Sequence, residues 1–412
     1  MKYVKKEPKP VDKIELNERH IKLRFILFIL CFCVVIVCAV FIFIGFSREE
    51  SGWTRIEASP KTALSCEEDF VLSYDLGTTK EGATAEARNI SAIYTEALET
   101  AYMLLDRYHA YDDVVNVYTI NHAPGEILSV DGVLYAALEQ MVSSNAKLLY
   151  MAPIYSYYED IFGASSVEMA NALDPYYHSS VQTYFQSILS FIDSNQIKLE
   201  LLGENKIRLS LSPEYLSFAE ENEITGFLDF SWLKNAFIID YVAEALIAKG
   251  YINGYISSYD GYFKNLDTEE KYNYTADILD TVEGSPSRIG QFVSKGTISI
   301  VQFRGFMYYQ SDTQRYYKMN DGTFRHLYID STDGLSKSAV SSLTCYSLGL
   351  SCSQIALQAA TAFIADEFVV PSDKNIGFIW SEGQTIKYTD SSLRLENLYH
   401  FGDIAYQGEW VE

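Results

Sequence analysis

The sequence of 412 residues predicts an α+β domain that follows a single N-terminal transmembrane helix. One long apolar run lies near the N-terminus, and the helical and strand patterns after it mix without the strict alternation of an α/β fold. The predicted organisation is a cytoplasmic basic tail (1–24), a transmembrane helix (25–46), a stalk (47–86) and one large domain (87–412).

The apolar run from Phe25 to Phe46 reads FILFILCFCVVIVCAVFIFIGF and contains no charged residue and no proline. As a helix it would be about 33 Å long, enough to cross a hydrocarbon core of about 30 Å. Eight Lys and Arg residues precede the run, whereas Arg48, Glu49 and Glu50 follow it. The positive-inside rule therefore predicts a cytoplasmic N-terminus and an extracytoplasmic domain in the cell membrane. A cleaved signal peptide is disfavoured because its apolar region would be shorter and would end at a small-residue cleavage site.

The large domain is strongly acidic. The whole chain has a formal net charge of −23, and the first 46 residues contribute +4, which leaves −27 for the rest. Such a domain repels polyphosphate, so no nucleic-acid partner is expected. Outside the apolar run lie Cys66, Cys345 and Cys352, without CxxC spacing. This predicts no zinc site and leaves two alternatives, a Cys345–Cys352 disulfide or unpaired core thiols.

Several elements follow from local patterns. Residues 197–212 alternate and turn at Gly203-Glu204-Asn205, which predicts a hairpin. Residues 227–230 predict a short strand, after which Ser231 is expected to cap a helix that ends at Gly250. The other predicted helices are 87–108, 131–143, 180–193 and 352–366, and the other predicted strands are 251–258, 296–303, 324–329, 339–347, 375–380 and 385–389.

Common catalytic signatures are absent from the sequence, including GxxxxGK[ST], GxGxxG, HExxH and GxSxG. The six histidines are scattered, so each is interpreted as an ordinary core or surface residue. Aspartate and glutamate are so abundant that no single carboxylate stands out. The tyrosine-rich stretch 154–162 is interpreted as core rather than as a ring-binding groove.

Three segments in a fixed order carry a family resemblance. The first, 107–141, contains the pair Ile120-Asn121; the second, 227–258, keeps Asp229 and Asp240 11 residues apart. The third, 321–347, contains Asp330 within an Asp–Gly turn. Together they resemble the FAD:protein FMN transferases, known as ApbE or thiamine-biosynthesis lipoproteins, over most of the outer domain.

The resemblance implies a two-lobed, T-fold-related domain with a flavin cleft outside the cytoplasm. It also implies a reaction that moves FMN from FAD to a Ser or Thr hydroxyl of a flavoprotein, with Mg²⁺ on the pyrophosphate. The positions that match cofactor-binding residues of the family are Asn121, Asp229, Asp240, His326 and Asp330. Thr361 matches the threonine of the metal motif.

The departures from the family pattern fall on the residues that the chemistry needs. Trp232 stands where the family has a glycine, and Asn235 stands where it has a lysine, with Lys234 one position away. If Thr361 is the threonine of the metal motif, Leu357 occupies the position of the family's metal-binding aspartate. No Asp or Glu occurs between Asp333 and Asp366 that could replace it. An apolar side chain cannot replace a carboxylate at a divalent cation. The departures thus favour a chain that holds neither FAD nor Mg²⁺.

Three hypotheses follow. The first is a membrane-anchored, non-catalytic relative (a pseudoenzyme) that serves as a binding or scaffold module beside a flavoprotein or another membrane-complex partner. In the second, an active transferase uses Asp260 and Asp333 in place of the missing acid. In the third, an unrelated surface domain binds a protein or a glycan through aromatic residues. For Asp229 and Asp240 the competing interpretation is structural, as carboxylates that hold the fold.

Overall fold

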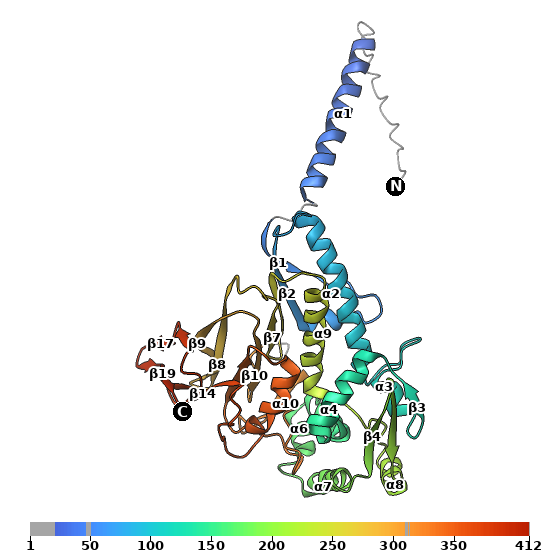
Figure 1. Ribbon diagram of the computed structural model, residues 1–412, viewed down its shortest axis with the longest axis vertical. Helices are drawn as coiled ribbons and strands as arrows, with labels where there is room; N and C mark the ends of the chain where they lie inside the picture. The colour runs from blue at the N-terminus through green and yellow to red at the C-terminus, as the bar shows by residue number, and fades with distance from the viewer. Residues whose placement is uncertain (1–20, 47–50, 310–311, 313, 412) are drawn as a thin grey trace, which may run out of the picture. The chain divides into compact units, whose positions relative to one another are not determined.

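The computed structural model describes residues 21–46, 51–309, 312 and 314–411. The chain forms two units, residues 1–50 and residues 51–412. In the first unit, helix α1 (Ile21–Phe46) covers the predicted apolar run (Figure 1). Across the part of the chain that is described, no helix is long and apolar enough to cross a membrane. Most of the predicted basic tail lies outside the described residues.

The second unit is built on a nine-stranded mixed sheet (Figure 1). Its neighbouring strands are antiparallel except for the last pair, β15 and β19. In spatial order the strands are β1 (Gly52–Ile56), β2 (Phe70–Leu76), β6 (Gly254–Ser258), β7 (Tyr262–Asn265), β10 (Ser299–Arg304), β13 (Ser342–Ser347), β14 (Gly377–Glu382), β15 (Thr385–Tyr388) and β19 (Gln407–Trp410).

Three helices pack together with this sheet: α2 (Ala83–Leu105), α9 (Lys234–Ala248) and α10 (Cys352–Phe363). Helix α9 contacts β6, β7, α2 and α10, and α10 contacts β10 and β13. The main hydrophobic core lies between these helices and the sheet, as the helical spacing of apolar residues requires. Gly250 follows α9 with φ +83°, a left-handed conformation that glycine adopts without strain, and ends the helix as predicted.

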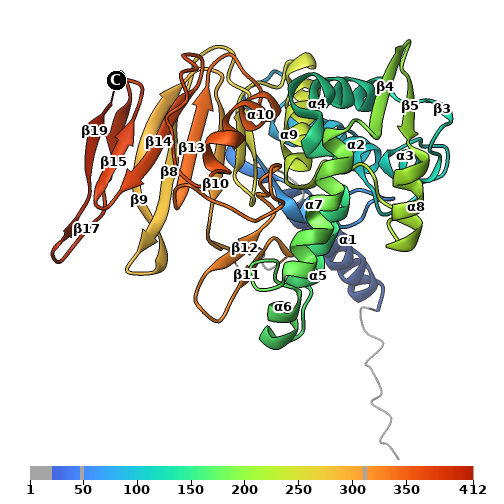
Figure 2. The same cartoon turned by 90° about the horizontal axis from the view of Figure 1, so that it is seen from below.

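Most of the remaining elements lie at the two ends of this core (Figure 2). At one end are further helices and a three-stranded sheet; at the other, the β8–β9 hairpin and β16 cover a second hydrophobic cluster. The helices are η1 (Cys66–Asp69), α3 (Val117–His122), α4 (Gly132–Tyr150), α5 (Ala152–Phe162), α6 (Val167–Leu173), α7 (Ser179–Asp193), α8 (Pro213–Glu221) and η2 (Ser231–Leu233). The strands are β3 (Ile127–Ser129), β4 (Ile197–Gly203), β5 (Lys206–Leu211), β8 (Asn273–Val282), β9 (Ser285–Lys295), β11 (Tyr316–Lys318), β12 (Phe324–His326), β16 (Arg394–Glu396), β17 (His400–Phe401) and β18 (Ile404–Ala405).

The α+β class and the 197–212 hairpin are confirmed, and the predicted helices are present with shifted ends. The stalk predicted over 47–86 is wrong for the described part of that range. Strands β1 and β2 pair with each other, and β2 pairs with β6, so the folded domain begins near residue 51. Cys66, Cys345 and Cys352 are buried and free, which decides between the two cysteine alternatives in favour of unpaired thiols.

The strand predicted at 227–230 is also wrong, because these residues form no ladder. They lead into η2, and Ser231 does not cap α9: its φ is +47°, and its hydroxyl has no hydrogen-bond partner. The strand, helix and strand predicted over residues 227–258 are therefore a loop, helix α9 and strand β6.

Candidate functional site

The loop 227–230 is held by side chains instead of a neighbouring strand. The Asn121 side chain accepts hydrogen bonds from the backbone N–H groups of Phe227 (3.1 Å) and Leu228 (2.8 Å) and donates to the Leu228 carbonyl (3.0 Å). Asn121 is buried, with 3% of its surface exposed. The side-chain amide of Asn121 both donates and accepts hydrogen bonds, so it can pair with backbone N–H and C=O groups in the way that a neighbouring strand does. In this structure, the predicted cofactor residue Asn121 thus fixes the loop that precedes α9.

Asp229, in the same loop, belongs to a buried ion-pair network. One carboxylate oxygen accepts from the Ser231 N–H (2.8 Å), and the other lies 3.2 Å from Arg107 Nε. Arg107 Nη2 also lies 2.5 Å from Glu159, which accepts a further hydrogen bond from Tyr108. Burial raises the pKa of Glu159 although Arg107 opposes this. Removing one member of such a network leaves a buried charge without its partner.

Lys234, the first residue of α9, places its ammonium group 3.6 Å from the centre of the Tyr102 ring. Burial lowers its pKa, and the carboxylates of Asp106, Asp229 and Asp69 act in the opposite direction. Among the described residues, no carboxylate lies within ion-pair distance of this amine. Burial without an ion-pair partner thus disfavours the charged form of this lysine.

The next residue, Asn235, connects two further acids to the same helix end. Its amide donates to Asp260 (2.9 Å) and to Asp69 (3.4 Å). Arg315 also pairs with Asp69 (2.9 Å). Burial raises the pKa of Asp260, and Arg315 opposes this.

We refer to these groups as the α9 cluster. It comprises Asp69, Asp106, Arg107, Glu159, Asp229, Lys234, Asn235, Asp260 and Arg315. Its five carboxyl groups outnumber its three cations. Burial raises the pKa of Glu159 and of Asp260. An excess of carboxyl groups over cations disfavours a pyrophosphate ligand.

Beside the α9 cluster lies a packed group of rings, which we call the ring cluster. Trp232 contacts Phe303 and Tyr328 edge-on, with ring centres 5.9 and 5.4 Å apart, and Phe363 stacks on Phe303 at 5.4 Å. The exposed fraction of Trp232 is 7%. The indole therefore occupies the interior at the position where the family resemblance places a glycine. The full ring cluster is Trp232, Phe303, Tyr316, His326, Tyr328 and Phe363.

His326 lies inside the ring cluster rather than in an open site. Its ring contacts Tyr328 at 5.3 Å, and its Nδ1 is 3.0 Å from the Ser336 hydroxyl. Burial, together with the neighbouring Arg325, lowers the pKa of His326 from 6.5 to about 3. The imidazole is thus neutral near pH 7 and has a structural hydrogen-bond partner.

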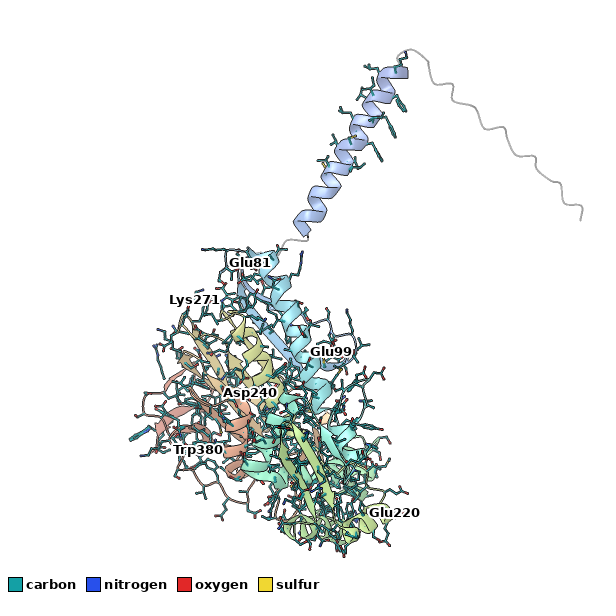
Figure 3. All side chains as sticks on the ribbon, turned by 45° about the vertical axis from the view of Figure 1, so that its right-hand side comes forward. Glu81, Glu99, Glu220, Asp240, Lys271 and Trp380 are labelled. Carbon is teal, nitrogen blue, oxygen red and sulfur yellow. The ribbon has the colours of Figure 1, made fainter. Side chains whose placement is uncertain are left out.

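Asp240 of α9, which is labelled in Figure 3, is buried and joins α9 to α10. Its two carboxylate oxygens accept the N–H groups of Cys352 and Ser353, each at 2.8 Å. These are orphan donors of the first turn of α10, which a carboxylate satisfies well. Further along α10, Leu357 is buried with 6% of its surface exposed, whereas Thr361 is exposed.

Asp330, the last of the predicted cofactor residues, orders its own turn. It accepts hydrogen bonds from the Thr332 N–H and hydroxyl (2.8 Å each) and pairs with Lys337 (3.0 Å). Burial alone would raise the pKa of Asp330, but the bonds from Lys337 and Thr332 outweigh it and lower the pKa. Gly334 completes the turn with φ +77° against Phe185.

The predicted site residues thus fall into separate environments. Asn121 and Asp229 share one loop, Asp240 caps α10, His326 lies in the ring cluster, and Asp330 orders a surface turn. Within the described ranges, no three His, Cys, Asp or Glu side chains are grouped so as to hold a metal ion. The ion pairs of Arg107 and Arg315 have no signal in the sequence, because their partners are 52 and 246 residues away along the chain and no local motif marks them.

Known proteins with a similar structure agree with this architecture. No protein-family model matches the chain, and no curated protein matches it by sequence. Among solved structures, the ApbE protein from Thermotoga maritima is similar, with a TM-score of 0.51, 11% identity, and coverage of 76% of this chain and 87% of that chain. Two others are a mutant of the flavin transferase ApbE from Vibrio cholerae (TM-score 0.49, 12% identity, 83% and 98% coverage) and the flavinyl transferase ApbE from Pseudomonas stutzeri (0.46, 12%, 82% and 94%). The similarity to the Thermotoga maritima structure shows that the chain has the fold of the ApbE proteins, at low sequence identity.

Proposed function

We propose that this chain is a membrane-anchored, extracytoplasmic ApbE-like domain that no longer transfers FMN and acts as a binding or scaffold module. One observation carries the proposal. The side chains at two positions on which the family's chemistry depends, Trp232 and Leu357, are both buried in the apolar interior.

Each of these side chains works against binding of FAD and Mg²⁺. Backbone can approach a phosphate closely at glycine because glycine has no Cβ, and the Trp232 ring occupies that space. Mg²⁺ requires oxygen ligands, and Leu357 offers none. Without the metal, the pyrophosphate charge would stand uncompensated in a domain of strongly negative net charge. The residues present do not fit a bound Mg²⁺–FAD.

An active transferase with replacement ligands is the second candidate. It would need Asp260 and Asp333 to act together. Asp260 instead bonds with Asn235 and Ser258, and Asp333 pairs with Lys337 at 2.7 Å. The two carboxylates have different partners in different elements, so this candidate is the weaker one.

Membrane anchoring is part of the same proposal. It is supported by the sequence and not by the helices of the structure, none of which, among the described residues, is long and apolar enough for a span. The run from Phe25 to Phe46 is free of charge, and its described side chains at 25–38 are exposed. Exposed apolar side chains of this number would be stabilised by burial in lipid. The partner proposed for the outer domain is a flavoprotein or another protein of a membrane complex, and no cofactor is proposed.

The test is a transfer assay on the full chain in detergent micelles. The chain is incubated with FAD, Mg²⁺ and an acceptor flavoprotein that carries the target Ser or Thr, and covalent FMN is read as in-gel fluorescence. An active flavin transferase on the same acceptor serves as the positive control. We expect no fluorescent acceptor with this chain. A fluorescent band that depends on Mg²⁺ would overturn the proposal.

A further inference from the structure

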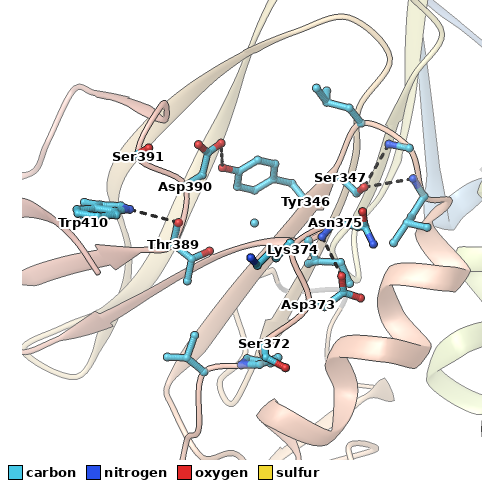
Figure 4. Close-up of a pocket in the computed structure, with 17 residues that line it drawn as sticks. Tyr346, Ser347, Ser372, Asp373, Lys374, Asn375, Thr389, Asp390, Ser391 and Trp410 are labelled. Carbon is cyan, nitrogen blue, oxygen red and sulfur yellow. Dashed lines mark hydrogen bonds between the residues drawn. The ribbon is translucent and has the colours of Figure 1, made fainter. Parts of the chain in front are cut away.

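A cavity of about 1100 Å³ lies in the C-terminal part of the domain, away from the residues that the family resemblance singles out (Figure 4). Four segments line it: residues 346–350 after β13, the loop 370–377 before β14, the turn 389–391 after β15, and Trp410 of β19. We call it the C-terminal cavity.

The walls of the C-terminal cavity are fixed by internal hydrogen bonds (Figure 4). Tyr346 donates to Asp390 (2.9 Å), whose other oxygen accepts from the Ser392 N–H and hydroxyl. The Trp410 indole donates to the Thr389 carbonyl (3.3 Å). The Ser347 hydroxyl accepts from two backbone N–H groups at 3.2 Å each. These bonds orient Trp410 and engage both oxygens of the Asp390 carboxylate.

Other polar side chains in the lining have no partner. Within the described part of the chain, no hydrogen bond or ion pair is made by the side chains of Ser372, Lys374, Asn375 or Ser391. All four are exposed. Asp373 uses one oxygen to accept the Asn375 N–H (2.8 Å) and leaves the other free. The cavity thus offers unpaired donors and acceptors together.

An aromatic surface stands beside these groups. Trp410 has 48% of its surface exposed, although its indole N–H is already bonded. About half of its side-chain surface is thus open to solvent at the cavity lining, and its one donor is occupied. A ring that is apolar on its face and fixed at its edge is well suited to pack against a ligand.

The ligand class follows from charge and hydrogen bonding. The lining contains one cation and two carboxylates, in a domain of negative net charge, which disfavours a polyanion. A metal cation is disfavoured because Asp390 has no free oxygen and Asp373 has only one. A purely apolar ligand would leave the polar side chains unsatisfied. A neutral ligand with many hydroxyl groups and an apolar face satisfies all of these conditions.

We propose that the C-terminal cavity binds a neutral oligosaccharide. A sugar ring stacks on Trp410, and its hydroxyl groups exchange hydrogen bonds with Lys374, Asn375 and the free oxygen of Asp373. The site is independent of any FAD site and of the outcome of the transfer assay, because it shares no residue with the α9 cluster or the ring cluster.

The experiment titrates the full chain in detergent micelles with maltotriose, cellotriose and chitotriose, monitored by isothermal calorimetry and by saturation-transfer NMR. We expect saturable binding of at least one probe. Trp410→Ala and, separately, Asn375→Ala should each weaken it by about ten-fold or more, as loss of a central anchor does.

The matched control is Trp53→Ala, because Trp53 is 49% exposed but lies on β1, outside this cavity. It should leave the affinity within about two-fold. A circular-dichroism melt of each variant establishes that it is folded, and Asn375→Ala, on an exposed residue, keeps the test valid if Trp410→Ala does not fold. The proposal is overturned if no probe binds saturably up to about 10 mM, or if neither cavity variant weakens binding more than the control.

Discussion

Most polar side chains of the α9 cluster contact other protein groups, whereas several polar side chains that line the C-terminal cavity do not. At the start of α9, Asp229, Asn235 and Asp260 all bond to other protein groups, and Trp232 is buried against Phe303 and Tyr328. In the C-terminal cavity, by contrast, Lys374 and Asn375 have no side-chain partner among the described residues, and Trp410 is half exposed. Groups that satisfy one another stabilise a fold, whereas unsatisfied groups beside an exposed ring are available to a ligand.

This difference changes where a function should be sought. The fold is that of the ApbE proteins, yet the residues at the family's positions hold helices and loops together. A fold does not determine a function, because function resides in the side chains of a particular site. Substitutions in the ring cluster and at the contact between α9 and α10 test this difference through the free energy of unfolding.

The largest effect is expected at the ring cluster. Trp232→Ala should lower the free energy of unfolding by about 3–5 kcal/mol, because it removes a buried ring and leaves a cavity. The measurement is chemical denaturation followed by circular dichroism. Trp53→Ala, at a half-exposed tryptophan, is the control and should cost far less. If the two variants lose equal stability, Trp232 is not packed as described.

A smaller loss is expected where α9 meets α10. Asp240→Ala should cost about 2–3 kcal/mol, because the N–H groups of Cys352 and Ser353 lose a charged acceptor. Asp131→Ala removes a comparable cap on α4, where the bond to the Val133 N–H is exposed, and should cost about 1 kcal/mol. Equal losses in the same denaturation assay would show that Asp240 is no more than an ordinary cap.

The smallest effect is a pH dependence from His326. Its pKa is lowered from 6.5 to about 3 in the folded chain, so between these pH values the unfolded chain binds a proton that the folded chain does not. The neutral ring therefore contributes stability that is present above pH 6.5 and is lost as the pH falls toward 3, by at most about 1.4 kcal/mol per pH unit.

His326→Gln removes this titration, so the variant should show a shallower loss of unfolding free energy between pH 6.5 and pH 4 than the parent chain, by about 1.4 kcal/mol per unit at most. The slope is the readout, whatever the overall stability of the variant. Identical slopes in the variant and the parent chain would mean that His326 is not buried as a neutral ring.

The sequence was sufficient for local features and insufficient for those that depend on distant contacts. The 197–212 hairpin and the end of α9 at Gly250 were predictable because neighbouring residues determine them. The loop 227–230 was predicted as a strand because its apolar residues resemble one. Its backbone is in fact satisfied by Asn121, 106 residues earlier. Residues 51–86 were predicted as part of a stalk because strands β1 and β2 are short. The partner of β2 in the sheet is β6, which lies far along the chain, so the pairing leaves no local signature.

The sites follow the same rule. Asp229 and Asp240 could be singled out from their spacing, but their partners, Arg107 and the start of α10, could not. The C-terminal cavity was invisible in the sequence because its lining comes from four separate segments.

The most direct test of the central claim is calorimetric titration of FAD into the full chain in detergent, with Mg²⁺ and then with EDTA. We expect no binding that depends on Mg²⁺, because Leu357 supplies no ligand and Trp232 fills the space of the glycine. Tight FAD binding that requires Mg²⁺ and disappears with EDTA would contradict it.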